Sequence, residues 1–141
     1  MATITCQFVR PDRLLFEGEV ASLVLVTPTG ELGVWPGHAP EICALGNGVV
    51  RLHRLPEDGG ATVEVIISGG YVEITPHQVI VLADHARRSD DIDADVVNET
   101  RDKAVASRDA LPAGDGRRAY YDNKIAWCDL LLQNAPQEHD A

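Results

Sequence analysis

Short β-branched runs separated by turn-forming residues are the feature that most constrains the fold of this chain. From Thr3 to about Ala86, clusters of Gly, Pro, Asn and Asp recur at intervals of about ten residues, the spacing of an antiparallel sandwich or barrel. No stretch of helical length interrupts this part, which disfavours a parallel βαβ arrangement. The strand-like runs are Val20–Val26, Val50–His53, Val63–Ile67 and Gln78–Leu82. We therefore predict an antiparallel β-sandwich.

The rest of the chain has a helical pattern. Carboxylates in Ile92–Asp95 are placed to cap the N-terminus of a first helix, which is expected to run to about Leu111. The stretch Pro112–Gly116 breaks it, and a second helix is expected from about Arg117 to Asn134. The expected inward residues are Val97, Thr100, Ala104, Ser107 and Leu111 on the first helix, and Tyr121, Ile125, Cys128 and Leu132 on the second, with Trp127 and Leu131 alongside.

These two patterns predict two domains. Residues 1–88 are expected to form the N-terminal β-sandwich, and residues 89–141 a C-terminal antiparallel two-helix hairpin with a short polar tail. A hairpin with so many small inward residues buries little apolar area by itself, so it is expected either to lie on the sandwich or to move.

Composition excludes several classes of function. The formal net charge of −10 makes nucleic acid and anionic lipid surfaces poor partners. The three cysteines are odd in number and form no CxxC pair, which argues against a disulfide framework and a structural zinc site. The first residues lack the pattern of a secretory signal, and no apolar run approaches the roughly 20 residues of a membrane span. Any membrane association is expected to go through another protein.

The stretch Gly30–Pro40, GELGVWPGHAP, is the candidate functional loop. Glu31 and His38 could act as a general acid and base, with Asp84 as a further carboxylate, or the loop could be a docking edge for a partner. The chain has no serine elbow, phosphate-binding loop or helical metal signature, which disfavours catalysis. The histidines that could gather as metal ligands share no ligand spacing, and no metal is expected; they are His38, His53, His77 and His85.

Two further features are structural candidates. Trp35 precedes Pro36 and is therefore held in extended geometry, either as a lid on the core or as an exposed anchor for a partner. Gly69 and Gly70 indicate a strand break or bulge where backbones approach closely.

Several motifs together resemble one family. They are GELGVWPGHAP at 30–40, SGGYVEI at 68–74, VLADHA at 81–86 and DID at 91–93. In order and spacing, over nearly the whole chain, they resemble the epsilon subunit of the bacterial F-type ATP synthase. The resemblance implies a non-catalytic rotor subunit of the central stalk of a proton-translocating enzyme, without a cofactor. The protein is expected at the cytoplasmic face of the cell membrane, as a peripheral protein. The alternative is that the chain is a free-standing β-sandwich module that binds a ligand or a protein.

The resemblance also assigns partners. The sandwich is expected to bind the gamma subunit and to rest on the ring of c subunits, with Glu31 and His38 as c-ring contacts. The docking loop would comprise Gly30, Gly33, Trp35, Pro36 and Gly37. The hairpin is expected to reach the catalytic alpha and beta subunits and to inhibit ATP hydrolysis. The candidate contacts to acidic beta surfaces are Arg101, Lys103, Arg108, Arg117, Arg118 and Lys124. From Asp90 onward, however, the sequence has twelve acidic residues and only these six basic ones.

The sequence departs from the family pattern at two places, and each departure leads to a prediction. Glu41–Ile42 stands where two leucines are common, so the local strand is expected to be more exposed. Some family members bind ATP through a motif Ile-Asp-x-x-Arg-Ala, and here Val96 and Val97 stand in place of the Arg and Ala. A polyanion would meet Asp93 and nearby carboxylates without that arginine, so no ATP binding is expected.

Overall fold

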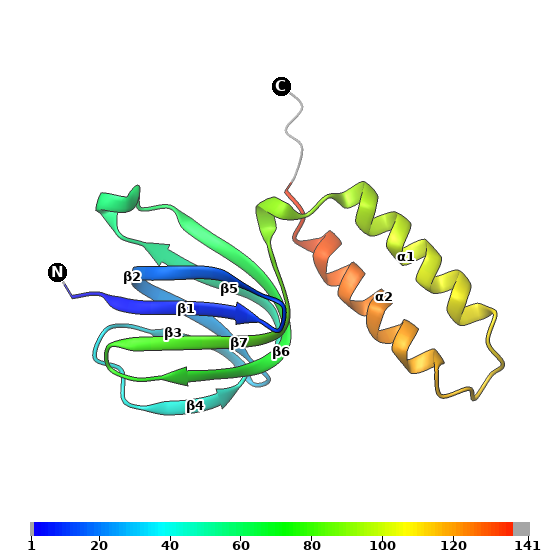
Figure 1. Cartoon of the computed structure of the whole chain (residues 1–141), viewed down its shortest axis with the longest axis horizontal. Coiled ribbons are helices and arrows are strands. Elements are labelled where there is room, and N and C mark those ends of the chain that lie inside the picture. The colour runs from blue at the N-terminus through cyan, green and yellow to red at the C-terminus, as the bar shows by residue number, and fades with distance from the viewer. Residues whose placement is uncertain (1, 137–141) are drawn as a thin grey trace, which may run out of the picture. The chain divides into compact units, whose positions relative to one another are not determined.

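The computed structural model describes residues 2–136, which divide into two compact units between Arg88 and Ser89. Figure 1 shows strands in the first unit, coloured blue to green, and helices in the second, coloured yellow to orange. The strands are β1 (Ile4–Arg10), β2 (Arg13–Thr27), β3 (Gly30–Val34), β4 (Glu41–Ala44), β5 (Asn47–Arg54), β6 (Thr62–Ile74) and β7 (Gln78–Arg88). The helices are α1 (Ala94–Asp109) and α2 (Arg118–Gln133), and short 3-10 turns occupy Pro56–Asp58 and Ser89–Asp91. The predicted combination of a β-sandwich with two C-terminal helices is confirmed.

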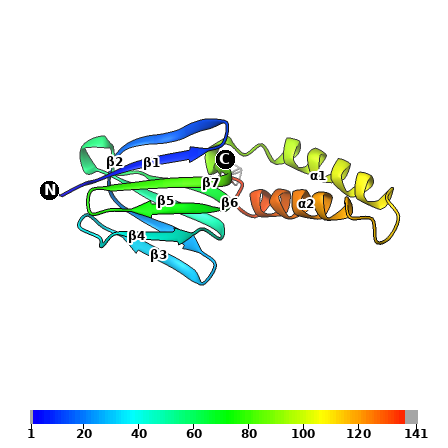
Figure 2. The same cartoon turned by 60° about the horizontal axis from the view of Figure 1, so that its bottom comes forward.

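The strands form one hydrogen-bonded sheet that folds over into two layers (Figure 2). Its order is β1-β7-β6-β5-β2-β3, with β4 paired to β6 and a further pairing of β1 with β2. Long strands contribute to both layers: β6 pairs with β5 through Thr62–Ser68 and with β4 through Tyr71–Ile74. The pairing of β1 with β7 is parallel, which differs from the all-antiparallel sheet that the sequence predicts.

The core between the layers follows from strand alternation. Along β1, Ile4, Cys6 and Phe8 are fully buried while the residues between them are half-buried, as expected when successive side chains point to opposite faces. Burial raises the pKa of the Cys6 thiol to about 12. The equivalent residues of the other strands complete one apolar cluster, including Leu23, Leu25, Val50, Leu52, Val65, Ile67, Val72, Ile74, Val79 and Val81.

Gly70 marks the close approach that the sequence predicts between neighbouring backbones. Its φ is +124°, and a Cβ at this position would overlap the carbonyl oxygen of Leu82 and lie 2.8 Å from the Cα of Ala83, both on β7. Strand β6 nevertheless continues through Gly69 and Gly70, so the two glycines do not break it. They allow one long strand to serve both layers.

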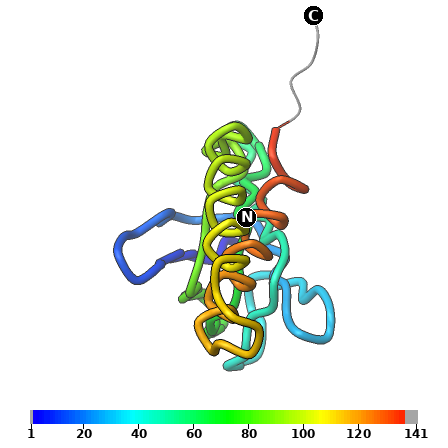
Figure 3. Tube along the Cα trace, turned by 90° about the vertical axis from the view of Figure 1, so that its right-hand side faces the viewer, coloured from blue at the N-terminus to red at the C-terminus, as the bar shows by residue number. Residues whose placement is uncertain are grey.

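The helices begin and end within two residues of the predicted bounds. The Asp93 carboxylate caps α1, accepting hydrogen bonds from the N–H groups of Asp95 and Val96 at 3.1 and 3.3 Å, as predicted. Figure 3 shows the two helices side by side. No helix within residues 2–136 is long and apolar enough to cross a bilayer.

The inward faces of the helices differ in part from the prediction. Val97 and Ala104 are buried on α1, but Ser107 is exposed. On α2, Ile125 and Cys128 are buried as expected, and Leu131 is more buried than Leu132. Polar contacts also join the two helices, since Arg101 and Arg108 of α1 form ion pairs with Asp129 and Asp122 of α2.

Candidate partner-docking surfaces

The first half of the Gly30–Pro40 stretch is a strand, which corrects its interpretation as a loop throughout. Gly30–Val34 forms β3, joined to β2 by the two-residue turn Pro28–Thr29. The Thr27 hydroxyl donates to the carbonyl oxygen of Gly30 at 2.7 Å and closes this turn. Gly30 and Gly33 of the predicted docking loop therefore belong to a sheet strand, and only the segment from Trp35 onward is a turn.

The turn itself is held by backbone hydrogen bonds. The N–H of His38 donates to the Trp35 carbonyl at 3.1 Å, and the N–H of Gly37 donates to the Pro76 carbonyl at 2.8 Å. Gly37 has a φ of +86°, a conformation that a side chain disfavours, while Pro36 fixes its own φ. These contacts anchor the turn to the segment that precedes β7.

Glu31 and His38 make their polar contacts with different residues. A carboxylate oxygen of Glu31, an exposed residue of β3, lies 3.5 Å from Nη1 of Arg51. His38 places Nδ1 2.7 Å from the carbonyl oxygen of Ala39 and Nε2 3.9 Å from the carboxylate of Glu41. The Glu31 side chain is 62% exposed and that of His38 only 21%. Of the two, Glu31 is the better placed to meet another protein.

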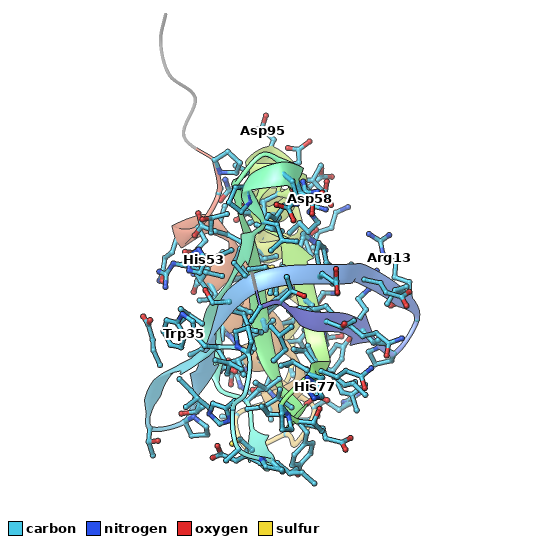
Figure 4. All side chains as sticks on the ribbon, turned by 90° about the vertical axis from the view of Figure 1, so that its left-hand side faces the viewer. Arg13, Trp35, His53, Asp58, His77 and Asp95 are labelled. Atoms are coloured by element: carbon cyan, nitrogen blue, oxygen red, sulfur yellow. The ribbon has the colours of Figure 1, made fainter. Side chains whose placement is uncertain are left out.

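Trp35 is an exposed side chain, not a lid on the core. It is 59% exposed, and its six-membered ring lies against Gly33, where a Cβ would overlap Cζ3 and lie 2.8 Å from Cη2. Figure 4 shows Trp35 on the side of the sandwich away from Arg13. Tryptophan is enriched among the residues that dominate the binding energy of protein interfaces, so an exposed Trp35 favours an anchor for a partner.

The other sites weighed from the sequence do not gather into a chemical centre. His53 contacts the hydroxyl of Thr62 at 3.2 Å, Nδ1 to Oγ1. Asp84 is exposed beside Gly69. Among residues 2–136, no group of three or more His, Cys, Asp or Glu side chains could hold a metal ion.

An exposed apolar row, which the sequence pattern does not predict, crosses the sandwich. Ala44 pairs with Tyr71, Tyr71 with Leu82, Leu82 with Val9, and Val9 with Leu14, so one line of neighbours crosses β4, β6, β7, β1 and β2. Directly paired residues share a face of the sheet. Tyr71 is 63%, Leu82 51% and Leu14 47% exposed. We call these five residues the apolar row.

Further apolar surface adjoins the row. On β4, Ile42 is 75% exposed, as expected from the departure at Glu41–Ile42, and it pairs with Glu73, which pairs with Ile80. Glu73 separates these two isoleucines, so the unbroken line of apolar neighbours is the apolar row itself. Exposed apolar side chains that gather on one face are typical of a protein interface. Alternation along β6 and β7 would have predicted that Tyr71 and Leu82 point outward, but not that they are neighbours, because that pairing depends on the register between strands.

All six basic candidates in the hairpin have partners within the hairpin. Arg101 donates to Asp129 at 2.6 Å, and Arg108 to Asp122 at 3.0 Å, each across the two helices. These carboxylates raise the pKa of both guanidinium groups. The remaining four pair more locally: Lys103 with Glu99, Arg117 with Asp115, Lys124 with the ring of Tyr120, and Arg118 with two carbonyls at the end of α1.

Arg118 joins the helices in a different way. Its Nη1 donates to the carbonyl oxygens of Arg108 at 2.8 Å and Leu111 at 3.0 Å. A helix ends with carbonyl groups that lack intrahelical partners and carries partial negative charge there, so a cation at this place is stabilising. Arg118, at the start of α2, thus caps the end of α1.

The start of α1 bears on nucleotide binding. The Asp93 carboxylate is engaged with backbone N–H groups, and Val96, at the place of the motif arginine, is 54% exposed. The stretch therefore presents carboxylates without a nearby cation from the motif.

Comparisons with known proteins agree on one family. Residues 3–89 match the family described as ATP synthase, Delta/Epsilon chain, beta-sandwich domain. The ATP synthase epsilon chain of Moorella thermoacetica is 38% identical over 114 residues, which is 81% of this chain and 83% of that protein. The epsilon chain of Bacillus pumilus is 34% identical over 119 residues, covering 84% of this chain and 88% of that one.

A solved structure has the same fold. A chain in the cryo-EM structure of the Euglena gracilis mitochondrial ATP synthase (OSCP, F1 and c-ring, rotational state 1) is similar with a TM-score of 0.73 and 22% identity, covering 94% of this chain and 81% of that chain.

Proposed function

This chain belongs to the ATP synthase epsilon chain family, and from that membership we propose that it works in the rotor, coupling the c ring to the gamma subunit. As a member of this family it is a non-catalytic subunit. The family membership favours this role over that of a free-standing sandwich. The proton-translocating complex would hold it at the cytoplasmic face of the cell membrane through its partners.

The apolar row is the observation that carries the proposal. A subunit that stays attached during rotation needs a stable interface, and such interfaces have apolar cores. The row lies on strands that are hydrogen-bonded to one another across the sandwich, so it is rigid before binding and loses little entropy on docking. We assign the row to the gamma subunit.

A binding experiment with the full chain tests this assignment. Tyr71→Glu and Leu82→Glu place a charge within the row and are expected to abolish co-purification with gamma at moderate salt. Ala61→Glu adds the same charge at an exposed position between the 3-10 turn Pro56–Asp58 and β6 and is expected to bind normally. Retained binding in both row variants, with folding confirmed by circular dichroism, would remove gamma from this surface.

The c ring is assigned to the turn after β3. Glu31, near the start of β3, and the ring of Trp35, in the turn, are both exposed, and the backbone hydrogen bonds of Gly37 and His38 hold the turn in one shape. Glu31 is proposed as a direct polar contact. His38 is proposed to contact the c ring too, and its proximity to Glu41 links the contact to β4.

The hairpin is proposed to inhibit ATP hydrolysis by contacting the catalytic alpha and beta subunits. Its basic residues would meet acidic beta surfaces, although carboxylates outnumber them two to one from Asp90 onward. Removal of residues 90–141 from the assembled complex is expected to raise ATP hydrolysis. An unchanged rate would contradict the inhibitory role and leave the rotor role standing.

A further inference from the structure

Two Arg–Asp pairs fix how the helices of the hairpin lie on each other. Nε of Arg101 is 2.6 Å from Oδ1 of Asp129, and Nη1 of Arg108 is 3.0 Å from Oδ1 of Asp122. The arginines are one heptad apart on α1 and the aspartates one heptad apart on α2. In an antiparallel hairpin, a residue seven positions further along one helix lies opposite a residue seven positions earlier on the other helix. Both pairs therefore specify a single alignment.

Apolar packing alone specifies this alignment weakly. Only two side chains of α1, Val97 and Ala104, are buried, and one of them is alanine. A helix of this length is marginal in water without tertiary contacts, and polar pairs at a helix interface can select one register. The two Arg–Asp pairs thus add both stability and specificity to the contact between the helices.

We propose that these two pairs are an ionic latch that keeps Arg101 and Arg108 from acidic partners while the hairpin is closed. With α1 on α2, the carboxylates of Asp122 and Asp129 occupy the guanidinium groups. When the helices separate, Arg101 loses its carboxylate and Arg108 keeps only that of its neighbour Asp109, 3.2 Å from Nε. Donor groups of both arginines then become available to carboxylates of another chain. The latch rests on the proposed inhibitory role of the hairpin, since that role supplies the acidic partner.

The ion pairs of the latch are weak enough for carboxylates of another chain to replace them. Its four side chains are between 28% and 56% exposed, so water and salt screen the pairs. Exposed pairs of this kind shift an equilibrium by roughly two- to five-fold each. Opening is therefore expected to increase with ionic strength.

Lys103 provides the contrast. It pairs with Glu99 on its own helix, and both side chains are largely exposed. Opening the hairpin does not break this pair. Glu99→Gln is thus a matched control that removes a carboxylate and an ion pair from α1 without touching the latch.

The first test measures opening in the isolated full chain. In Asp122→Asn/Asp129→Asn, hydrogen exchange of α1 and α2 peptides is expected to accelerate by roughly ten-fold, because a separated helix frays. Peptides of the sandwich serve as the reference within the same molecule. Exchange no faster than in Glu99→Gln would overturn the latch.

The second test measures inhibition in the assembled complex. The Asp122→Asn/Asp129→Asn subunit is expected to lower ATP hydrolysis below the wild-type rate, because both arginines lose their carboxylate partners on α2. Arg101→Gln/Arg108→Gln is expected to raise hydrolysis. A variant in which arginine and aspartate are swapped within both pairs is expected to restore slow hydrogen exchange in the isolated chain, because the pairs form again. ATP hydrolysis is expected to stay high in this variant, because the cations then lie on the other helix.

The outcomes separate the latch from the inhibitory role. If removal of residues 90–141 raises hydrolysis but the aspartate variants match the wild type, the exchange of partners is wrong and inhibition stands. If the removal has no effect, inhibition and the exchange of partners both fail. Hydrogen exchange in the isolated chain still decides whether the pairs hold the helices together.

Discussion

Replacing Gly70 with alanine tests whether the close approach of β6 and β7 shapes the sandwich and its apolar row. The new Cβ would overlap the carbonyl oxygen of Leu82 and lie 2.8 Å from the Cα of Ala83. Both are backbone atoms of β7, so no side-chain rotation can relieve the contact. The strand must shift, and with it the paired Tyr71 and Leu82.

The expected loss of stability has two parts. A side chain at a φ of +124° costs about 1–3 kcal/mol in backbone strain, and forcing an atom into packed surroundings costs about 1–3 kcal/mol more. The total is about 2–6 kcal/mol. A unit of this size is stable by roughly 4–13 kcal/mol, so the substitution removes a large share.

Thermal unfolding of the full chain, followed by the β-sheet circular dichroism signal, measures the effect. The Tm of the sandwich is expected to fall by about 8 °C or more. Gly37→Ala is the matched control, since Gly37 has a φ of +86° with nothing within 4 Å of the added Cβ, and it should cost only about 1–2 kcal/mol. A Gly70→Ala variant as stable as this control would refute the clash with β7.

Four further predictions concern the docking turn and the hairpin. Glu31→Ala/His38→Ala is expected to lower proton-driven ATP synthesis in the assembled complex while the subunit stays folded, and unchanged synthesis would remove both residues from the c-ring contact. Asp93→Ala removes the N-cap of α1 and should cost about 1 kcal/mol, measured as faster hydrogen exchange in its first turn. Calorimetric titration of ATP into the purified chain is expected to show no saturable binding, and micromolar binding would contradict this. Hydrogen bonds from Arg117 lower the pKa of Asp115 from 3.8 to about 2, so this pair should stabilise the loop above pH 3.8 and stop doing so as pH falls through 2. An NMR titration of the Asp115 carboxyl should show this low midpoint, and Arg117→Gln should raise the midpoint.

Local patterns predicted the elements of this chain well. The runs at Val20–Val26, Val63–Ile67 and Gln78–Leu82 all lie inside observed strands, because β-branched residues and alternation report on the strand itself. The capping role of Asp93 is equally local and was predicted correctly. The continuation of β6 through Gly69–Gly70 was not, since glycine weakens a strand pattern, and only the neighbouring backbone of β7 explains its presence.

Features that depend on the register between strands or between helices could not be predicted from the sequence. The apolar row joins residues as distant as Val9 and Leu82, and no single strand reveals that pairing. The exposure of Trp35 was left open because a tryptophan before a proline suits either a core or a surface. The Arg–Asp pairs of the hairpin left a readable signal, the heptad spacing of charges on both helices, but the choice of partner follows only from the antiparallel alignment.

Coupling, in the proposed function, requires that the c-ring contact and the gamma contact belong to one rigid body. The turn at Trp35–His38 leads directly into β4, and β4 pairs with β6 from Glu41↔Ile74 to Ala44↔Tyr71. The Gly37 hydrogen bond to the Pro76 carbonyl ties the same turn to the segment just before β7. A force on the turn therefore reaches the apolar row through backbone hydrogen bonds of adjacent strands, which deform little because the core beneath them is close-packed. On this argument the glycines and prolines of the turn serve to fix its backbone against the sheet, and a flexible replacement of the turn should weaken coupling even if Glu31 is kept.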